Sequence, residues 1–138
     1  MNTAWVSKRV LLGCIAALAT MLVFDLLITL SGRPLDLPLQ SGLGSIPVGT
    51  LLVTFGAMLL GGWIARRRFR WVALGLTLAL WLTVVVALLA VGEPPVDSFG
   101  AVLRFNGFAI VLSLAAAWCG ALAGERLGAR SLSAPASV

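Results

Sequence analysis

Four stretches of about twenty consecutive apolar residues dominate this sequence and leave it very few possible folds. They cover about residues 10–30, 46–65, 71–91 and 99–123. A helix needs about 20 apolar residues to cross a hydrocarbon core of roughly 30 Å, so each stretch can span a bilayer once. An open sheet cannot satisfy its backbone hydrogen bonds in lipid. The pattern predicts an all-α membrane protein with four transmembrane helices in two hairpins.

The composition indicates that lipid surrounds most of this chain. Of the 138 residues 60% are hydrophobic and 11% are charged, whereas a soluble domain is about 25% charged. The net charge of +5 could suggest a nucleic-acid partner. The basic residues lie at the ends of the apolar stretches, however, which is where the positive-inside rule places them. We therefore expect the lipid bilayer as a partner and no nucleic acid.

The connections between the spans predict where the helices begin and end. The segment SGRPLDLPLQSGLGS separates the first two spans and is rich in Pro and Gly, which interrupt helices. Ser45 can cap the second helix, with Pro47 in its first turn. Only RRRFR joins the second and third spans. We expect a tight hairpin there, with those two helices as antiparallel neighbours.

The distribution of Lys and Arg predicts the orientation of the spans. The basic residues near one end are Lys8, Arg9, Arg66, Arg67, Arg68, Arg70, Arg126 and Arg130. The other end has Arg33 in the first connection and Arg104 near the start of the fourth span. This bias predicts an inner-membrane protein with both termini in the cytoplasm. Trp63, Trp71 and Trp118 gather toward the same basic end, as an interfacial aromatic belt would.

The chain divides into a transmembrane domain and a short tail. Residues 1–130 form the predicted four-helix domain, and residues 131–138 are small and polar, so we expect a disordered cytoplasmic tail. The first apolar segment lacks a small-x-small cleavage signal before its loop. We expect it to be retained as a span and not removed as a signal peptide.

Asp25 is the most informative residue inside an apolar span, about five residues from the outer end of the first helix. An acidic residue at the centre of a span costs roughly 2.5–3.5 kcal/mol and less toward the interface, so it is expected to have a partner. Arg104 and Asn106, on the same outer side, are the predicted partners, and Arg33 is a second possibility. Three interpretations stay open: a polar cluster that fixes packing, a proton- or cation-coupling site, or interfacial placement without a special role.

Small residues four apart form stripes on three of the predicted helices. In lipid, helices associate by close approach through such residues. The helix-packing residues predicted in this way are Gly61, Gly75, Ala79, Ala116, Gly120 and Gly124. One interpretation is that the stripes pack the four helices against one another. The other is a contact face for a second membrane protein or a second copy of the chain.

The sequence shows no set of residues for catalysis, for a metal or for a cofactor. It has no His, no cluster of His, Cys, Asp and Glu with ligand spacing, and no glycine-rich phosphate loop. The hydroxyl residues within the spans lack a neighbouring base that would activate them, and they can bond back to their own helix. These residues are Thr20, Thr29, Thr50, Thr54, Thr77, Thr83 and Ser113.

Arg66, Arg67, Arg68 and Arg70 are expected to lie close to the inner leaflet. Each attracts anionic lipid by about 1 kcal/mol. Their role is either to set the orientation of the spans or to dock an acidic cytoplasmic partner. The stretch GGWIARRRFRWVALGLTLAL that contains them resembles the middle hairpin of small uncharacterised bacterial four-helix inner-membrane proteins, which have a GG-x-I-A turn followed by basic residues. The resemblance implies a small inner-membrane protein and implies no activity.

Two functional hypotheses follow from the sequence. The first is a non-enzymatic inner-membrane protein that acts through helix–helix contacts as an accessory, scaffold or assembly subunit. It depends on the absence of site chemistry together with several small-residue faces. The alternative is a small oligomeric transporter or channel that uses Asp25 with Arg104 as a polar coupling site.

Overall fold

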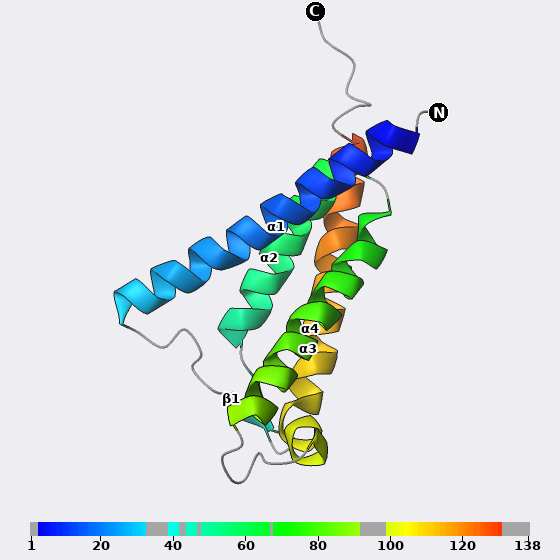
Figure 1. Cartoon of the computed structure of the whole chain (residues 1–138). Helices are drawn as coiled ribbons and strands as arrows, with labels where there is room; N and C mark the ends of the chain where they lie inside the picture. Colours follow the sequence, from blue (N-terminus) through cyan, green and yellow to red (C-terminus); the bar gives the residue numbers. More distant parts are fainter. Residues whose placement is uncertain are drawn as a thin grey trace, which may run out of the picture.

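Among the residues that the structure describes, the fold has four long helices and one short hairpin of strands (Figure 1). The computed structural model describes residues 3–32, 39–41, 44–46, 48–66, 68–91 and 99–130. The elements are α1 (Thr3–Ser31), β1 (Leu39–Ser41), β2 (Gly44–Ile46), α2 (Val48–Ala65), α3 (Phe69–Val91) and α4 (Phe99–Arg130). The expected all-helical architecture with four spans is therefore confirmed at the level of the helices.

Each of the four helices is long and apolar enough to cross a membrane. The qualifying segments are Lys8–Ser31, Val48–Ala65, Phe69–Val91 and Asn106–Arg130. Large apolar side chains are exposed along all four helices, for example Leu22, Leu52, Leu82 and Val111, each at least 63% exposed. A water-soluble monomer rarely exposes such a continuous apolar surface, whereas lipid solvates it without cost. These features indicate a multi-pass membrane protein.

The helix boundaries differ from the expected ones at three places. α1 begins at Thr3 and α4 continues to Arg130, because polar residues can prolong a helix beyond the apolar window that predicts it. α2 begins at Val48, so Ser45 does not cap it. Ser45 instead pairs with Gln40 in an antiparallel ladder between β1 and β2, which satisfies backbone groups in that connection. Pro47 and the tail 131–138 lie outside the described residues.

The helices run alternately in opposite directions. This alternation brings the segments that contain most of the Lys and Arg residues to the same end of the bundle. The basic end is where α1 begins, α2 ends, α3 begins and α4 ends, and the far end is where α1 ends at Ser31 and α3 at Val91 (Figure 1). α2 packs chiefly against α1 on one side and α4 on the other, and α3 packs against α4. α2 and α3 are antiparallel as expected, but α4 is the main neighbour of each. α2 and α3 contact each other only slightly, so the expected hairpin holds for their direction but not for close packing between them.

The glycines of α4 allow its backbone to lie directly against α2. A Cβ atom at Gly120 would collide with the carbonyl oxygen of Phe55, and one at Gly124 would collide with that of Leu59. Ala116, one turn earlier, is half-buried. The predicted stripe on the fourth helix therefore packs within the chain.

Gly61 on α2 has a similar role toward α1. A Cβ atom there would lie 2.8 Å from the carbonyl oxygen of Gly13, and a Cβ atom at Gly13 would lie 2.7 Å from that of Gly61. The two backbones thus cross with no side chain between them, as small residues permit in membrane helices. Phe69, fully buried at the start of α3, fills the space beside this crossing.

The small-residue stripe on α3 faces away from the other helices. Gly75 and Ala79 are exposed, and no atom would lie within 4 Å of a Cβ at Gly75. The buried face of α3 contains Phe69, Ala73 and Thr77 instead. Residues two apart on a helix point in nearly opposite directions. Of the two interpretations of this stripe, Gly75 and Ala79 do not pack within the described residues, and the contact face for another helix stays a prediction.

Candidate functional site

The outer part of α1 diverges from the other helices and leaves a cavity at the far end. Figure 1 shows α1 crossing α2 near the basic end and moving away from it toward Ser31. The cavity has a volume of about 320 Å³ and is lined by residues from all four helices. Its polar lining consists of Asp25, Thr50, Thr54, Thr77, Trp81 and Ser113. In a chain this apolar, the convergence of six polar side chains on one space marks it as the candidate site.

Two hydroxyl groups of the cavity wall, those of Thr77 and Ser113, are held by bonds to their own helices. Thr77 Oγ1 donates to the carbonyl oxygen of Ala73 at 2.8 Å, and Ser113 Oγ donates to that of Ile110 at 2.9 Å. Both side chains are buried, at 3% and 5% exposed. Such back-bonding was expected from the sequence, and here it fixes each hydroxyl oxygen in place.

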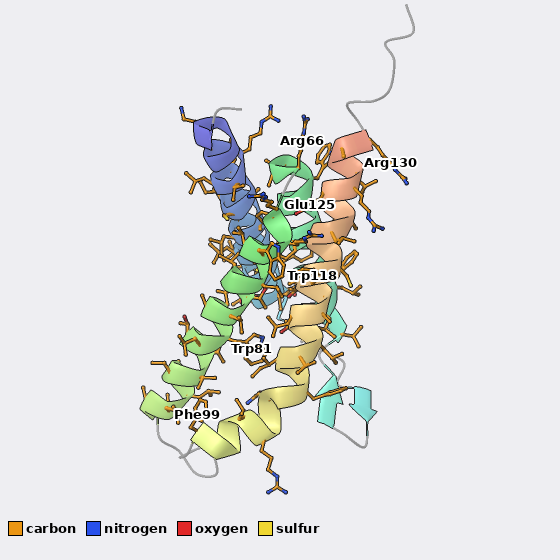
Figure 2. All side chains as sticks on the ribbon, turned by 90° about the vertical axis from the view of Figure 1, so that its right-hand side faces the viewer. Arg66, Trp81, Phe99, Trp118, Glu125 and Arg130 are labelled. Atoms are coloured by element: carbon orange, nitrogen blue, oxygen red, sulfur yellow. The ribbon has the colours of Figure 1, made fainter. Side chains whose placement is uncertain are left out.

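Trp81 joins α3 to α4 at the cavity. Its Nε1–H donates to Ser113 Oγ at 2.6 Å, and Figure 2 shows its side chain between the two helices. A buried indole N–H needs an acceptor, and Ser113 supplies it. Sequence reasoning did not single out Trp81. Its position near the middle of a span, away from the interfacial tryptophans, was the available signal.

Asp25 lines the cavity from α1 and is the one charged residue among the described residues that do so. It lies six residues before the end of α1 at Ser31, which corresponds to a depth of about 9 Å along the helix. Its backbone carbonyl oxygen accepts a hydrogen bond from Thr29 Oγ1 at 2.8 Å. Asp25 is exposed, and its side chain borders a largely apolar cavity that contains a few polar groups.

Arg104 and Asn106 do not line this cavity. Arg104 is exposed and Asn106 is half-buried, both near the start of α4. Ser113, which reaches the cavity from α4, lies nine residues beyond Arg104, or about 13 Å along the helix. Because α1 diverges at the far end, the expected cluster of Asp25 with Arg104 and Asn106 is not assembled at the cavity. The residues around Asp25 are hydroxyls and Trp81 instead.

A second polar cluster lies at the basic end and involves a residue that the sequence analysis missed. Glu125 of α4 accepts a hydrogen bond at Oε1 from the backbone N–H of Arg70 at 2.9 Å. The Arg70 guanidinium lies 5.5 Å from the centre of the Trp118 ring, which in turn packs edge-on against Trp71. Figure 2 shows Glu125 above Trp118 near this end of the bundle. The cluster ties the start of α3 to α4.

Glu125 replaces a missing helix cap. Arg66 and Arg68 adopt left-handed backbone conformations, with φ values of 65° and 60°, and neither side chain is a good acceptor for the first N–H groups of α3. A carboxylate from α4 supplies that acceptor and complements the positive helix end. Arg67 lies outside the described residues. The signal in the sequence was that Glu125 is the one acidic residue at an end otherwise filled with Lys and Arg.

We predict that Glu125→Ala lowers the free energy of unfolding by about 1–2 kcal/mol, because it leaves the Arg70 N–H without its acceptor. Glu125→Gln should cost less, since an amide oxygen can still accept. Thermal unfolding in detergent micelles measures both, with the exposed neighbour Arg126→Gln as control. Equal stability of Glu125→Ala and the parent protein would contradict the capping role.

Comparisons with known proteins add no family to this description. No family model, no curated protein and no solved structure matches the chain. Within the part of the chain that the structure describes, no group of three or more His, Cys, Asp or Glu side chains comes together as a metal site.

Proposed function

We propose that this chain is a small, non-enzymatic membrane carrier whose solute binds in the cavity beside Asp25. The observation that supports the proposal is the convergence of polar side chains from all four helices on one intramembrane space that contains a carboxylate. Ionisable residues inside spans are costly and commonly mark solute or ion pathways. Of the two hypotheses from the sequence, the geometry favours the transporter. The residues that accompany Asp25 at the proposed site are then hydroxyl residues and not Arg104.

A carrier fits this geometry better than an open channel. The basic half of the bundle is packed with fully buried side chains, among them Met58, Phe69 and Ala121. The close crossing of Gly13 and Gly61 lies in the same half. A solute in the cavity therefore meets a dry barrier toward the basic end, so passage requires the helices to move. α1 packs chiefly against α2 and touches α3 only slightly, and its outer half is exposed, so we propose α1 as the helix that moves.

The proposed location is the inner membrane, with both termini in the cytoplasm. The support is the gathering of basic residues at one end: Lys8, Arg9, Arg66, Arg68, Arg70, Arg126 and Arg130 belong to segments that meet there. The cavity then faces the outer side. A reporter fused after Val138 that is active only in the cytoplasm tests this orientation, and activity only outside would reverse it.

We predict that Asp25→Asn abolishes solute flux. The purified protein is reconstituted into liposomes, and uptake is measured for matched small solutes that are cationic, neutral or anionic. The parent protein should move at least one class above the rate of empty liposomes, and Asp25→Asn should remove that flux because the carboxylate is lost without a change of shape. Arg104→Gln, outside the cavity, is the control and should keep the flux. No protein-dependent flux in any class would overturn the carrier.

A second candidate function, the accessory or scaffold subunit, is favoured by one observation. Gly75, Ala79 and Thr83 form an exposed small-residue face on α3 that packs against nothing within the described chain. In lipid such a face suits close contact with another helix. The particle mass in mild detergent tests this: Gly75→Leu should dissociate a complex that Gly56→Leu, also at an exposed glycine, leaves intact. A monomer in the parent protein would remove the candidate.

A further inference from the structure

Two hydroxyl groups of the cavity wall and the Trp81 indole are engaged as donors within the wall, and the two hydroxyl oxygens still face the cavity as acceptors. The Thr77 and Ser113 hydroxyl protons are donated to backbone carbonyls, and the Trp81 N–H is donated to Ser113. A hydroxyl oxygen has two acceptor sites, so Thr77 and Ser113 each retain acceptor capacity. These three donors, from Thr77, Trp81 and Ser113, are thus already used within the wall.

Asp25 gives this wall a negative charge. An ionised carboxylate only accepts hydrogen bonds, and it has about four lone-pair sites. In a space of low polarity its field is stronger than in water, which favours a cation and disfavours an anion. A bound anion would lose part of its hydration in the cavity and would be repelled by the Asp25 carboxylate. The chemistry of the polar lining therefore selects a cation that carries N–H donors.

The rest of the lining defines the body of that ligand. Met21, Ile28, Val53, Leu80 and Val84 form the apolar part of the cavity wall. The volume of about 320 Å³ lies at the small end of ligand sites, which are roughly 300–1,000 Å³. We propose that the cavity binds a small primary amine in its protonated form, with the ammonium group at Asp25 and the hydroxyl oxygens and a compact apolar group against the remaining wall. This inference rests on the proposed function and names its substrate class.

Four probes of nearly the same shape separate charge from hydrogen bonding. They are benzylamine, which is a cation with N–H donors at neutral pH, benzyltrimethylammonium, which is a cation without them, benzyl alcohol and benzoate. Binding is measured as the rise in the unfolding temperature of the intact protein in micelles. Benzylamine should bind most tightly, benzyltrimethylammonium more weakly, benzyl alcohol more weakly still, and benzoate should give no shift.

Two variants connect the binding to the proposed contacts. Asp25→Asn should weaken benzylamine binding about ten- to a hundredfold, because a charge-assisted hydrogen bond is lost. Thr77→Val keeps the shape of the wall but removes an acceptor, and it should weaken binding severalfold. Arg104→Gln should leave the affinity unchanged. Asp25→Asn removes a charge from an apolar span, so the variant is expected to insert at least as well as the parent.

The possible outcomes test two proposals separately: that the ligand is an amine, and that the protein is a carrier. Binding of benzyl alcohol or benzoate as tight as that of benzylamine, or an unchanged affinity in Asp25→Asn, would overturn the amine class. Protein-dependent flux of neutral or anionic solutes would then still support a carrier. Conversely, Asp25-dependent benzylamine binding without flux would support the site and overturn the carrier. Absence of binding by all four probes would overturn the amine class as well.

Discussion

Gly124→Ala is expected to lower the free energy of unfolding by about 2 kcal/mol or more, a large effect for a single added methyl group. Gly124 lies on α4 where the backbone touches α2. The new Cβ would collide with the carbonyl oxygen of Leu59 and would lie 2.7 Å from the backbone nitrogen of Trp63. Backbone atoms cannot rotate away as the end of a side chain can, so α2 and α4 must separate along their whole contact. Thermal or chemical unfolding in micelles measures the loss.

Gly107→Ala is the matched control on the same helix. No atom would lie within 4 Å of a Cβ at Gly107. Because Ala favours a helix over Gly by up to about 1 kcal/mol, this variant should be as stable as the parent or slightly more stable. If Gly124→Ala and Gly107→Ala behaved alike, α2 and α4 would not be packed backbone to backbone, and the arrangement of the bundle would need revision.

The four helices could be predicted from the sequence because lipid imposes a simple length requirement on apolar segments. The ends of the helices could not, because that requirement applies only to the apolar window. α4 continues through polar residues to Arg130, and Ser45 forms a strand pair and not a helix cap. The expectation that a short connection makes α2 and α3 antiparallel neighbours failed in part for a similar reason. The short connection RRRFR fixes the direction of α3, but the glycines of α4 determine which helix lies against α2.

The stripes differ in what they contact: one packs against a neighbouring helix, and the other does not within the described residues. α4 packs through Gly120 and Gly124 as expected. On α3, Gly75 with Ala79 and Ala73 with Thr77 are both small pairs at a spacing of four, and they lie on nearly opposite faces. Periodicity contains no information about which of the two faces meets a neighbour. The bulky Phe69, in register with Ala73 and Thr77, belongs to the buried face.

The candidate site was predicted in part. Asp25 was identified from the cost of a carboxylate in an apolar span, and the cavity contains it. Its partners were misassigned because the prediction treated the helices as parallel rods and matched residues by depth alone. The divergence of α1 moves the outer residues of α4 away and places Thr77, Trp81 and Ser113 around the cavity. Sequence alone identified the hydroxyls as back-bonded residues but could not show that they converge.

Water access to Asp25 is the most direct test of the central claim, which is that α1 opens a polar cavity at the far end. The free cysteines Cys14 and Cys119 are first replaced by Ala. Asp25→Cys and Leu26→Cys are then compared in intact cells with a membrane-impermeant maleimide, which reacts with thiolates in water. Leu26 is 59% exposed on the apolar surface and lies about 1.5 Å nearer the end of α1, so depth alone would favour its modification.

The cavity predicts the opposite order. Asp25→Cys should be modified quickly from outside, and Leu26→Cys should stay unmodified because lipid covers it. Benzylamine should not slow the modification of Asp25→Cys, because that variant has lost the carboxylate that binds the amine. Modification of Leu26→Cys at the same rate as Asp25→Cys, or no modification of Asp25→Cys, would contradict the claim that a water-filled cavity reaches Asp25.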